Sequence, residues 1–429
     1  MQFAKLRYLI IYLLLVVFLD ACKPKDEVFP TISIIQPTIG TIYNVYDTVF
    51  VGVEAIDETE LQSVNVRLVD ANFVSISVTK SVSINASNSE GFAELIITDK
   101  QLETGTYHVV ATAFDGINES HAYQEIRIFE LPQKRRGIYF STQGQFGQIW
   151  ILDSLFSAVE SWVNPMQDIG KLCVNSRFDR ITVVGNISRE LQTFDLANTS
   201  VLWFDDAVNV GQIQRFTDLL CFENTVYAAF FDKEIRSYSA SGALTMNELT
   251  GNYRPEVLYA DDIFLVAGMT LVGGNTNHIF VFNRLSRVLL WQQQLPMSVK
   301  AICKLENDDI LLFGNDGNQA RVLHYDIGNN AYWEPRQLPA GRILDVVKLE
   351  SQRFGIAHET GLYSYTYNPN YLNQIGSIQY QDICFDVDYG TLIGATGNTL
   401  NEIHTTNGQV LNFVTASDSI TSLDIHYTR

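Results

Sequence analysis

AICKLENDDILLFGNDGNQARVLHYDIGNNAYWE, residues 301–334, contains the pattern on which the fold of this chain depends. Short runs of aliphatic, β-branched and aromatic residues, such as ILLF and VLHY, alternate with Gly, Asn and Asp. Such runs are typical of β-strands, and the polar residues between them are typical of turns. The stretch therefore predicts four strands joined by turns: AICKL, ILLF, VLHY and AYWE.

The same four-strand repeat recurs along the second part of the chain. Each repeat has an inner strand, a block like ILLFGN, a strand that ends on a polar turn, and often a last strand with Trp. The block spacings run from 37 to 47 residues and average about 42, the period of a four-stranded propeller blade. Six complete repeats emerge, with blocks that begin at Ile181, Val226, Ile263, Ile310, Phe354 and Leu392.

The two ends of this region supply a seventh repeat. GIYFST, GQIWILD and VESWV, within residues 137–163, predict three strands that lack an inner one, whereas ITSLDIHY, residues 420–427, predicts an inner strand that lacks the rest. Joining the two closes the ring and hides sheet edges that would otherwise favour aggregation. We therefore expect an all-β chain whose residues 137–429 form a seven-bladed β-propeller closed by 420–427, with eight blades as the alternative.

The repeat resembles that of quinoprotein-like or WD-repeat-like propellers over residues 137–429. The resemblance rests on TTNGQVLNF and on three turn residues, each followed by a Trp: Asp195 and Trp203, Asn283 and Trp291, Asp326 and Trp333. Quinoprotein enzymes hold calcium beside the quinone with acidic and amide ligands, and they carry a vicinal Cys pair nearby. This chain has no adjacent Cys pair, so we expect no cofactor.

Residues 30–130 predict a separate all-β domain. Seven strands in about 100 residues suit an immunoglobulin-like sandwich. GTYHVVATAFDG resembles a late strand of bacterial Ig-like domains, with Tyr107 placed as a tyrosine corner. LPQKRRG begins at Leu131, and its Pro and three cations predict a linker at 131–136. The seven strands are expected in TISIIQP, DTVFVGVEAI, SVNVRLVD, SISVTKSVSI, GFAELIIT, GTYHVVATAFD and YQEIRIF.

The N-terminus resembles that of a bacterial lipoprotein. An apolar run of about 12 residues follows Lys5 and Arg7, which is too short to span a bilayer and matches a secretory signal. The sequence LDAC then ends on Cys22, in the manner of a lipobox. The resemblance implies a signal peptide at 1–21, lipidation of Cys22 and a tether at 22–29. An uncleaved apolar N-terminus with a chance Cys is the alternative.

The net charge limits the kinds of partner, and two acidic residues near Cys22 indicate a location. The net charge of −19 makes nucleic acid an unsuitable partner. Asp26 and Glu27, close to the lipidated Cys22, resemble the export tags of surface-exposed lipoproteins in some Gram-negative bacteria. We therefore expect a lipid anchor in the outer membrane, and the sequence leaves open which leaflet, the inner one or the cell surface, carries the protein.

Residue types that carry chemistry do not form a recognisable catalytic motif. The sequence lacks the G-x-S-x-G elbow, the Walker loop, the dinucleotide fingerprint and metal-binding His spacings. A pair of carboxylates of the glycosidase type can come from distant segments, so the sequence leaves this alternative open. Four Cys are assigned to one register of the inner strands, where we expect buried thiols rather than disulfides or a metal site: Cys173, Cys221, Cys303 and Cys384. We expect no catalytic, cofactor or metal residue.

If a ligand binds, the expected place is the propeller face made by the loops after each second strand and before the next inner strand. Asn, Asp and Gly enrich these loops, and amides and carboxylates can hydrogen-bond sugars, peptides or partner loops equally well. Turn geometry explains the same residues, so the sequence specifies no binding residue. The loops are GNISRE, FDKE, GGNTNH, GNDGNQ and HETG.

A lipid tether, a spacer domain and a rigid ring without a catalytic motif are the parts of a surface presented beside membrane machinery. We therefore expect a non-catalytic interaction or scaffold subunit of an outer-membrane protein complex for transport, secretion or assembly. The expected partner is an outer-membrane protein. A glycan- or peptide-binding lipoprotein for nutrient capture is the alternative, and a quinoprotein-like or glycan-cleaving enzyme is the second alternative.

Overall fold

The computed structural model describes residues 28–58, 60–83, 88–143, 147–163, 168–185, 190–205, 216–305 and 309–428. All regular elements within these ranges are β-strands. The chain forms two compact units that divide between Pro132 and Gln133. The predicted signal peptide, the predicted lipidation site Cys22 and most of the predicted tether, up to residue 27, lie outside the described residues.

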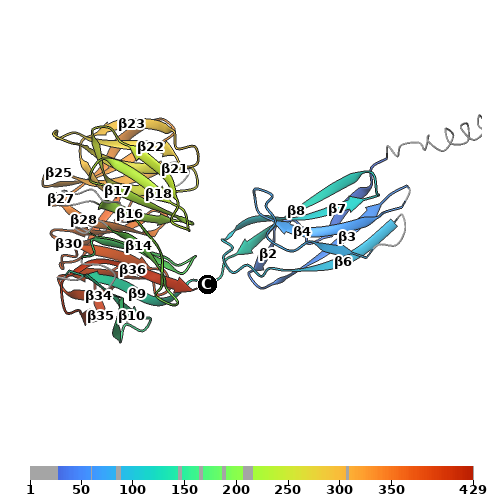
Figure 1. The fold of residues 1–429 in the computed structure, drawn as a ribbon, viewed down its shortest axis with the longest axis horizontal. Helices are drawn as coiled ribbons and strands as arrows, with labels where there is room; N and C mark the ends of the chain where they lie inside the picture. The colour runs from blue at the N-terminus through green and yellow to red at the C-terminus, as the bar shows by residue number, and fades with distance from the viewer. Residues whose placement is uncertain are drawn as a thin grey trace, which may run out of the picture. The chain divides into compact units, whose positions relative to one another are not determined.

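The described residues of the N-terminal unit form two sheets, whose strands are labelled in Figure 1. One sheet has the order β1 (Thr31–Gln36), β3 (Thr48–Ile56), β6 (Asn88–Ile96). The other has the order β2 (Thr41–Asn44), β8 (Glu119–Phe129), β7 (Gly105–Phe114), β4 (Ser63–Val69), β5 (Lys80–Val82), and its β2 runs parallel to β8.

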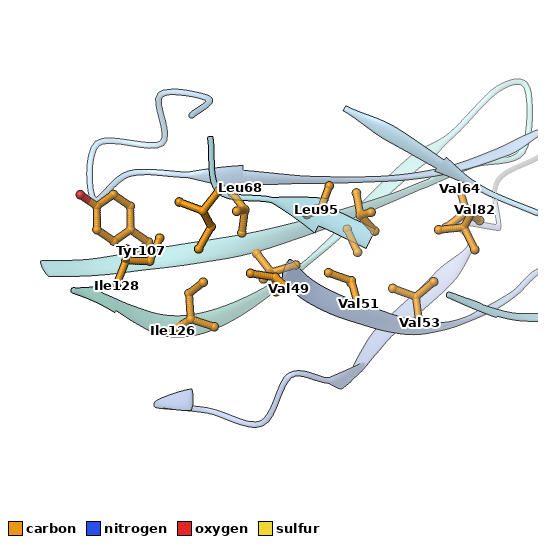
Figure 2. Close-up of a cluster of buried hydrophobic side chains, with 14 of the residues drawn as sticks. Val49, Val51, Val53, Val64, Leu68, Val82, Leu95, Tyr107, Ile126 and Ile128 are labelled. Carbon is orange, nitrogen blue, oxygen red and sulfur yellow. The ribbon is translucent and has the colours of Figure 1, made fainter. Parts of the chain in front are cut away.

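The two sheets of this unit share one apolar core. Alternate residues of β3, namely Val49, Val51 and Val53, are buried because successive side chains of a strand point to opposite faces. Figure 2 shows these valines between the sheets, together with Leu68 of β4 and Ile126 of β8. The Tyr107 side chain lies at the edge of this core, and its hydroxyl donates to the Glu103 carbonyl at 2.9 Å, the bond expected of a tyrosine corner.

Two details of the N-terminal unit differ from the sequence prediction. The described residues contain eight strands rather than seven, because the short β2 was not predicted. Only Lys80–Val82 of the predicted strand 75–84 is assigned to a strand, as β5. Both segments are short edge strands, whose alternation covers too few residues to give a clear pattern.

The described residues of the C-terminal unit form seven four-stranded antiparallel sheets. Each sheet runs outward from an inner strand. The first four sheets, from the inner strand to the outer one, are β36 (Ile420–Thr428), β9 (Lys134–Thr142), β10 (Gln148–Asp153), β11 (Val159–Val163); β12 (Lys171–Asn175), β13 (Arg180–Val184), β14 (Leu191–Asp195), β15 (Val201–Asp205); β16 (Phe216–Phe222), β17 (Thr225–Phe230), β18 (Glu234–Tyr238), β19 (Leu244–Leu249); and β20 (Tyr253–Ala260), β21 (Phe264–Leu271), β22 (Asn277–Asn283), β23 (Leu289–Leu295).

The other three sheets follow the same order along the chain. They are β24 (Ser298–Lys304), β25 (Asp309–Asp316), β26 (Gln319–Asp326), β27 (Ala331–Ala340); β28 (Ile343–Glu350), β29 (Arg353–His358), β30 (Gly361–Thr366), β31 (Tyr371–Gly376); and β32 (Asp382–Asp386), β33 (Thr391–Thr396), β34 (Thr399–His404), β35 (Val410–Thr415).

Neighbouring sheets meet through their inner strands. Contacts run from β12 through β16, β20, β24, β28 and β32 to β36, and β36 in turn contacts β12. Strand β36, from the C-terminus, pairs with β9, from the start of the unit; Figure 1 shows the two side by side. Apolar side chains fill the space between the sheets, as at Val266, Val281 and Leu312.

The predicted linker at 131–136 is wrong in its second half. Strand β9 begins at Lys134, and Arg135 is buried against the sheet of β32–β35. The sequence LPQKRRG predicts a linker because the partners of Arg135 are not visible locally. These partners, Asp386 and Glu402, lie more than 250 residues away in the sequence. The connection between the two units is therefore shorter than expected.

The predicted common register of the four cysteines is wrong for one of them. Cys173, Cys303 and Cys384 each lie opposite the second residue of the neighbouring block: Thr182, Leu311 and Ile393. Cys221 lies opposite Val226, the first residue of its block. A shift of one position reverses the face to which a side chain points. The error arose because KLCVN and LLCFE can be aligned on Cys without regard to strand pairing.

Aspartates on the inner strands connect neighbouring sheets. Each of four carboxylates accepts a hydrogen bond from a main-chain N–H of the next inner strand. These hydrogen bonds hold consecutive inner strands in register. The bonds are Asp218 Oδ2 with Leu258 N at 2.7 Å, Asp345 Oδ2 with Ile383 N at 2.8 Å, Asp382 Oδ2 with Leu423 N at 2.9 Å, and Asp424 Oδ2 with Val174 N at 2.7 Å.

Asp424 makes the stability of the C-terminal unit dependent on pH. Burial raises the pKa of Asp424 to about 6; Lys171 lowers it and Asp382 raises it further. The folded state therefore binds this proton more tightly than the unfolded chain, and stability decreases as pH rises from about 4 to about 7. Asn does not titrate, so the free energy of unfolding of Asp424→Asn should not show this decrease. We expect it to rise relative to that of the wild type by roughly 1–3 kcal/mol from pH 4 to pH 7. Urea unfolding of both proteins at the two pH values checks this. A difference in free energy of unfolding between variant and wild type that is the same at both pH values would contradict it.

Candidate functional site

A polar depression lies on the face where the sequence predicts ligand binding. It opens at the starts of the inner strands β20 and β24 and at the ends of β21 and β25, and its volume is about 530 Å³. This volume falls in the range of small-ligand sites. Its lining residues are Arg254, Glu256, Thr270, Gly274, Asn275, Asn277, Ser298, Val299, Lys300, Asn315, Asp316 and Gly317.

Two of the five predicted loops supply half of this lining. GGNTNH, from Gly273, joins β21 to β22, and GNDGNQ, from Gly314, joins β25 to β26 in the next sheet. Both loops turn on a glycine with positive φ, Gly273 at +80° and Gly317 at +58°, which residues with a Cβ rarely adopt. The FDKE and HETG loops do not line the depression, and residues 186–189 of GNISRE lie outside the described residues.

Asn315 holds the floor of the depression in place. Its side chain is 7% exposed, its Nδ2 donates to the Ile343 carbonyl at 3.0 Å, and its Oδ1 accepts from the Ile343 N–H at 2.8 Å. The amide thus pairs with the main chain of the next sheet in the way that a strand neighbour would. Ser298 Oγ donates to the carbonyl of Asn315 at 3.1 Å. These bonds give the depression a rigid base.

The two carboxylates in the lining are paired with arginines. Glu256 Oε1 accepts from Nε of Arg254 at 2.7 Å and from Nη2 of the same residue at 2.6 Å. The Arg254 guanidinium lies 4.6 Å from the centre of the Phe231 ring, which orients it further. Asp316 Oδ2 lies 3.0 Å from Nη2 of Arg321. The negative charge of the depression is therefore compensated within the protein.

Lys300 is the second cation of the lining. Its side chain is exposed at the start of β24, and no ion pair of Lys300 occurs in the part of the chain that the structure describes. Thr270 Oγ1 donates to Asn277 Oδ1 at 3.2 Å. The side-chain nitrogens of Asn275 and Asn277 donate no hydrogen bond to another described residue. The depression therefore offers the Lys300 ammonium and the side-chain amides of Asn275 and Asn277 as hydrogen-bonding groups.

The inner strands carry four cysteines, Cys173, Cys221, Cys303 and Cys384. All four are free, and Cys303 is buried. Burial raises the pKa of the Cys303 thiol to about 12 and that of Cys384 well above its usual range. Because a thiolate is the ligand and the nucleophile, a raised pKa makes both roles less accessible. Within the described ranges, no group of three His, Cys, Asp or Glu side chains is arranged to hold a metal ion.

The histidines are dispersed over both units. In the N-terminal unit, the His108 ring stacks with the Phe73 ring, and His121 Nε2 lies 3.7 Å from Glu119 Oε1. His324 stacks on Trp333 with ring centroids 3.7 Å apart and lies 2.7 Å from the Tyr367 hydroxyl. His426 Nε2 lies 2.9 Å from Asp179 Oδ1. These contacts are typical of packing and hydrogen bonding between strands.

The depression lies on the face predicted from the sequence, but the sequence did not specify its residues. The signal that could have located it is the succession of two amide-rich loops, GGNTNH and GNDGNQ, in consecutive repeats. Consecutive repeats are neighbours in space, so their equivalent loops lie side by side. Arg254, Glu256 and Lys300 could not have been found in this way, because they belong to inner strands with no distinguishing pattern.

No helix with the length and apolar character needed to cross a bilayer occurs among the described residues. The predicted lipidation of Cys22 lies outside them.

Known proteins resemble this chain in fold but not in sequence. No family model matches the chain, and no curated protein matches it. Hydrazine synthase of Kuenenia stuttgartiensis is 11% identical, with 67% of this chain and 98% of that chain covered and a TM-score of 0.51. A quinoprotein alcohol dehydrogenase-like protein of Bacteroides thetaiotaomicron is 10% identical, with 92% and 99% covered and a TM-score of 0.49.

A third similar structure is the Swd1 β-propeller domain of Myceliophteria thermophila, which is 10% identical, with 58% of this chain and 87% of that chain covered and a TM-score of 0.47. At such identities the likeness concerns the fold alone. Within the described residues the chain is all-β, and its four-stranded sheets follow one another in a propeller-like fold.

Proposed function

We propose that this protein is a lipid-anchored, non-catalytic interaction subunit of an outer-membrane protein complex. In this proposal, lipid on Cys22 holds the chain on the outer membrane. An Ig-like sandwich at 30–130 acts as a spacer, and a seven-bladed propeller from β9 to β36 presents the binding face. The partner is an outer-membrane protein.

The architecture of this proposal has separate supports. Seven four-stranded sheets and the return of the inner-strand contacts from β36 to β12 support seven blades. Two sheets over one core and the bond from Tyr107 to Glu103 support the Ig-like assignment. The order of charged, apolar and Cys residues at the N-terminus supports the anchor.

The observation that carries the function is the open depression whose carboxylates are already paired. A carboxyl group that acts as a general acid or base must exchange a proton with the substrate. Glu256 is held by two bonds from Arg254, and Asp316 is held by Arg321. The same groups, together with the amides of Asn275 and Asn277, are well suited to hydrogen-bonding a bound surface.

Affinity purification tests the proposal. A tagged full-length chain, extracted in mild detergent, is expected to bring down an outer-membrane protein in stoichiometric amount, identified by mass spectrometry. A chain recovered alone that binds a defined oligosaccharide would instead support nutrient capture. Hydrolysis of that sugar would support the enzyme alternative.

The anchor gives a separate prediction. Cys22→Ala is expected to move the protein from the membrane fraction to the soluble fraction and to abolish labelling with a fatty acid, because the thiol of Cys22 is the attachment point. Cys303→Ala serves as the control, since Cys303 is buried in the C-terminal unit and should keep both the label and the membrane location. Labelling that persists in Cys22→Ala would contradict the anchor.

A further inference from the structure

We propose that the depression between β20–β23 and β24–β27 binds an acidic polypeptide segment, and that Lys300 determines this specificity. The inference rests on the proposed function, because it names the chemistry of the partner segment. It goes beyond that function by assigning the site and the residue that selects the ligand.

The ion pairs of the depression leave the Lys300 ammonium without a partner. Arg254 pairs with Glu256 at 2.6 Å, and Arg321, which lies outside the lining, pairs with Asp316 at 3.0 Å and lies 3.7 Å from Glu334. Lys300 is exposed and makes no ion pair with any described residue, so its ammonium can contact a ligand. A ligand carboxylate would pair with this ammonium through a charge-assisted hydrogen bond.

The donors around Lys300 extend the same preference. The amide nitrogens of Asn275 and Asn277 have no hydrogen bond to other described residues, and both side chains lie in the lining. A carboxylate is an acceptor with two oxygens and about four lone-pair sites, so it can accept from an ammonium and an amide together. The three side chains come from two neighbouring sheets and line the same depression.

The lining favours a peptide over a sugar. Valine is the largest apolar side chain among the twelve lining residues, and aromatic residues are not among them. Sugar rings and free aromatic ligands gain much of their affinity from an aromatic surface, whereas an extended peptide can rely on amide and charge contacts. The volume of about 530 Å³ accommodates a few residues, not a folded domain.

The net charge of the protein limits how acidic the segment can be. A chain of charge −19 repels a strongly acidic partner at long range. At physiological salt this repulsion is screened beyond about 8 Å, so one or two carboxylates near Lys300 are attracted locally while a polyacidic tail is not. The site therefore fits a segment with one or two Glu or Asp residues.

Peptide titration of the full-length, detergent-solubilised chain tests the inference. The probes are acetyl-Gly-Glu-Gly-amide, its Gln counterpart and glucuronate, and the readout is the chemical shift of the Gly274 and Gly317 amides. We expect saturable shifts with the Glu peptide and at least about threefold weaker binding of the Gln peptide, because one exposed ion pair is lost. Lys300→Glu should weaken the Glu peptide by about tenfold, since it replaces attraction by repulsion.

A matched control and the contrary outcomes complete the test. Arg287→Glu makes the same charge reversal in the exposed turn between β22 and β23, at the opposite end of the same sheet from the depression, and should leave binding unchanged. Equal binding of the Glu and Gln peptides, loss of binding in both variants, or binding of glucuronate alone would each overturn the inference. If Lys300→Glu still recovers the outer-membrane partner in full, the inference fails while the proposed function stands.

Discussion

Replacing Arg135 by Met is expected to lower the free energy of unfolding of the C-terminal unit by about 3–5 kcal/mol, the range for breaking a buried ion pair. Arg135 is 5% exposed, and its Nη1 lies 2.6 Å from Asp386 Oδ2 and 2.9 Å from Glu402 Oε1. Asp386 and Glu402 are themselves buried. Removing the guanidinium therefore leaves two buried carboxylates without a counter-charge.

Other contacts of Arg135 join the two ends of the C-terminal unit. Its Nε and Nη2 donate to the Ser154 carbonyl at 3.1 and 2.8 Å, and its guanidinium lies 4.2 Å from the centre of the Tyr389 ring. Burial raises the pKa of Asp386, while Arg135 lowers it. The side chain thus connects the sheet of β9 to the sheet of β32–β35 through charge, hydrogen bonds and packing.

Urea unfolding monitored by Trp fluorescence measures this effect, and Lys134→Met is the matched control. Lys134 is the preceding residue, its side chain is 68% exposed, and its ion pair with Asp388 should contribute at most about 1 kcal/mol. Adding Asp386→Asn and Glu402→Gln to Arg135→Met should restore part of the stability, because the uncompensated charges are removed. A loss no larger than that of Lys134→Met would contradict the role of Arg135.

Deletion of residues 420–429 is expected to abolish cooperative folding of the C-terminal unit. The deletion removes β36, which pairs with β9, and with it the buried side chains of Ile420, Leu423 and Ile425. It also removes Asp424, whose carboxylate binds the main chain of β12. The remaining sheet of β9–β11 would expose the edge of β9, and an unpaired edge is a template for aggregation.

Size-exclusion chromatography with light scattering distinguishes aggregation from local fraying. Removal of Thr428 and Arg429 alone is the control, because Thr428 is exposed at the end of β36 and its loss should leave a monodisperse protein. A soluble product lacking 420–429 that still unfolds in a single transition would contradict the closing role of β36. That result would not contradict the assignment of seven sheets.

Much of the C-terminal unit could be predicted from sequence because its repeat is local. Each inner strand and each block recurs with a spacing near 42 residues, so strand order follows from counting. The described strands β12, β24 and β32 begin within three residues of the predicted inner strands. Alternation and turn residues act over a few positions, and a single sequence retains that information.

The contacts that matter most for stability and binding could not be predicted in this way. Arg135 was assigned to a linker because its partners Asp386 and Glu402 belong to the last repeat. The depression was missed because Arg254 and Lys300 lie on inner strands, where a charged residue has no local signature of a site. Cys221 was misplaced by one position because only strand pairing reveals a shift in register. All three depend on contacts between distant segments.

Site-specific photo-crosslinking tests the central claim most directly, because it asks whether the depression contacts a partner in the intact membrane. A photoreactive amino acid in place of Asn275, in the lining, is expected to give a light-dependent adduct with an outer-membrane protein. The same group in place of Arg287, in the turn between β22 and β23, should not. Lys300→Glu should reduce the adduct at 275. No protein adduct at 275, or equal adducts at 275 and 287, would contradict the account.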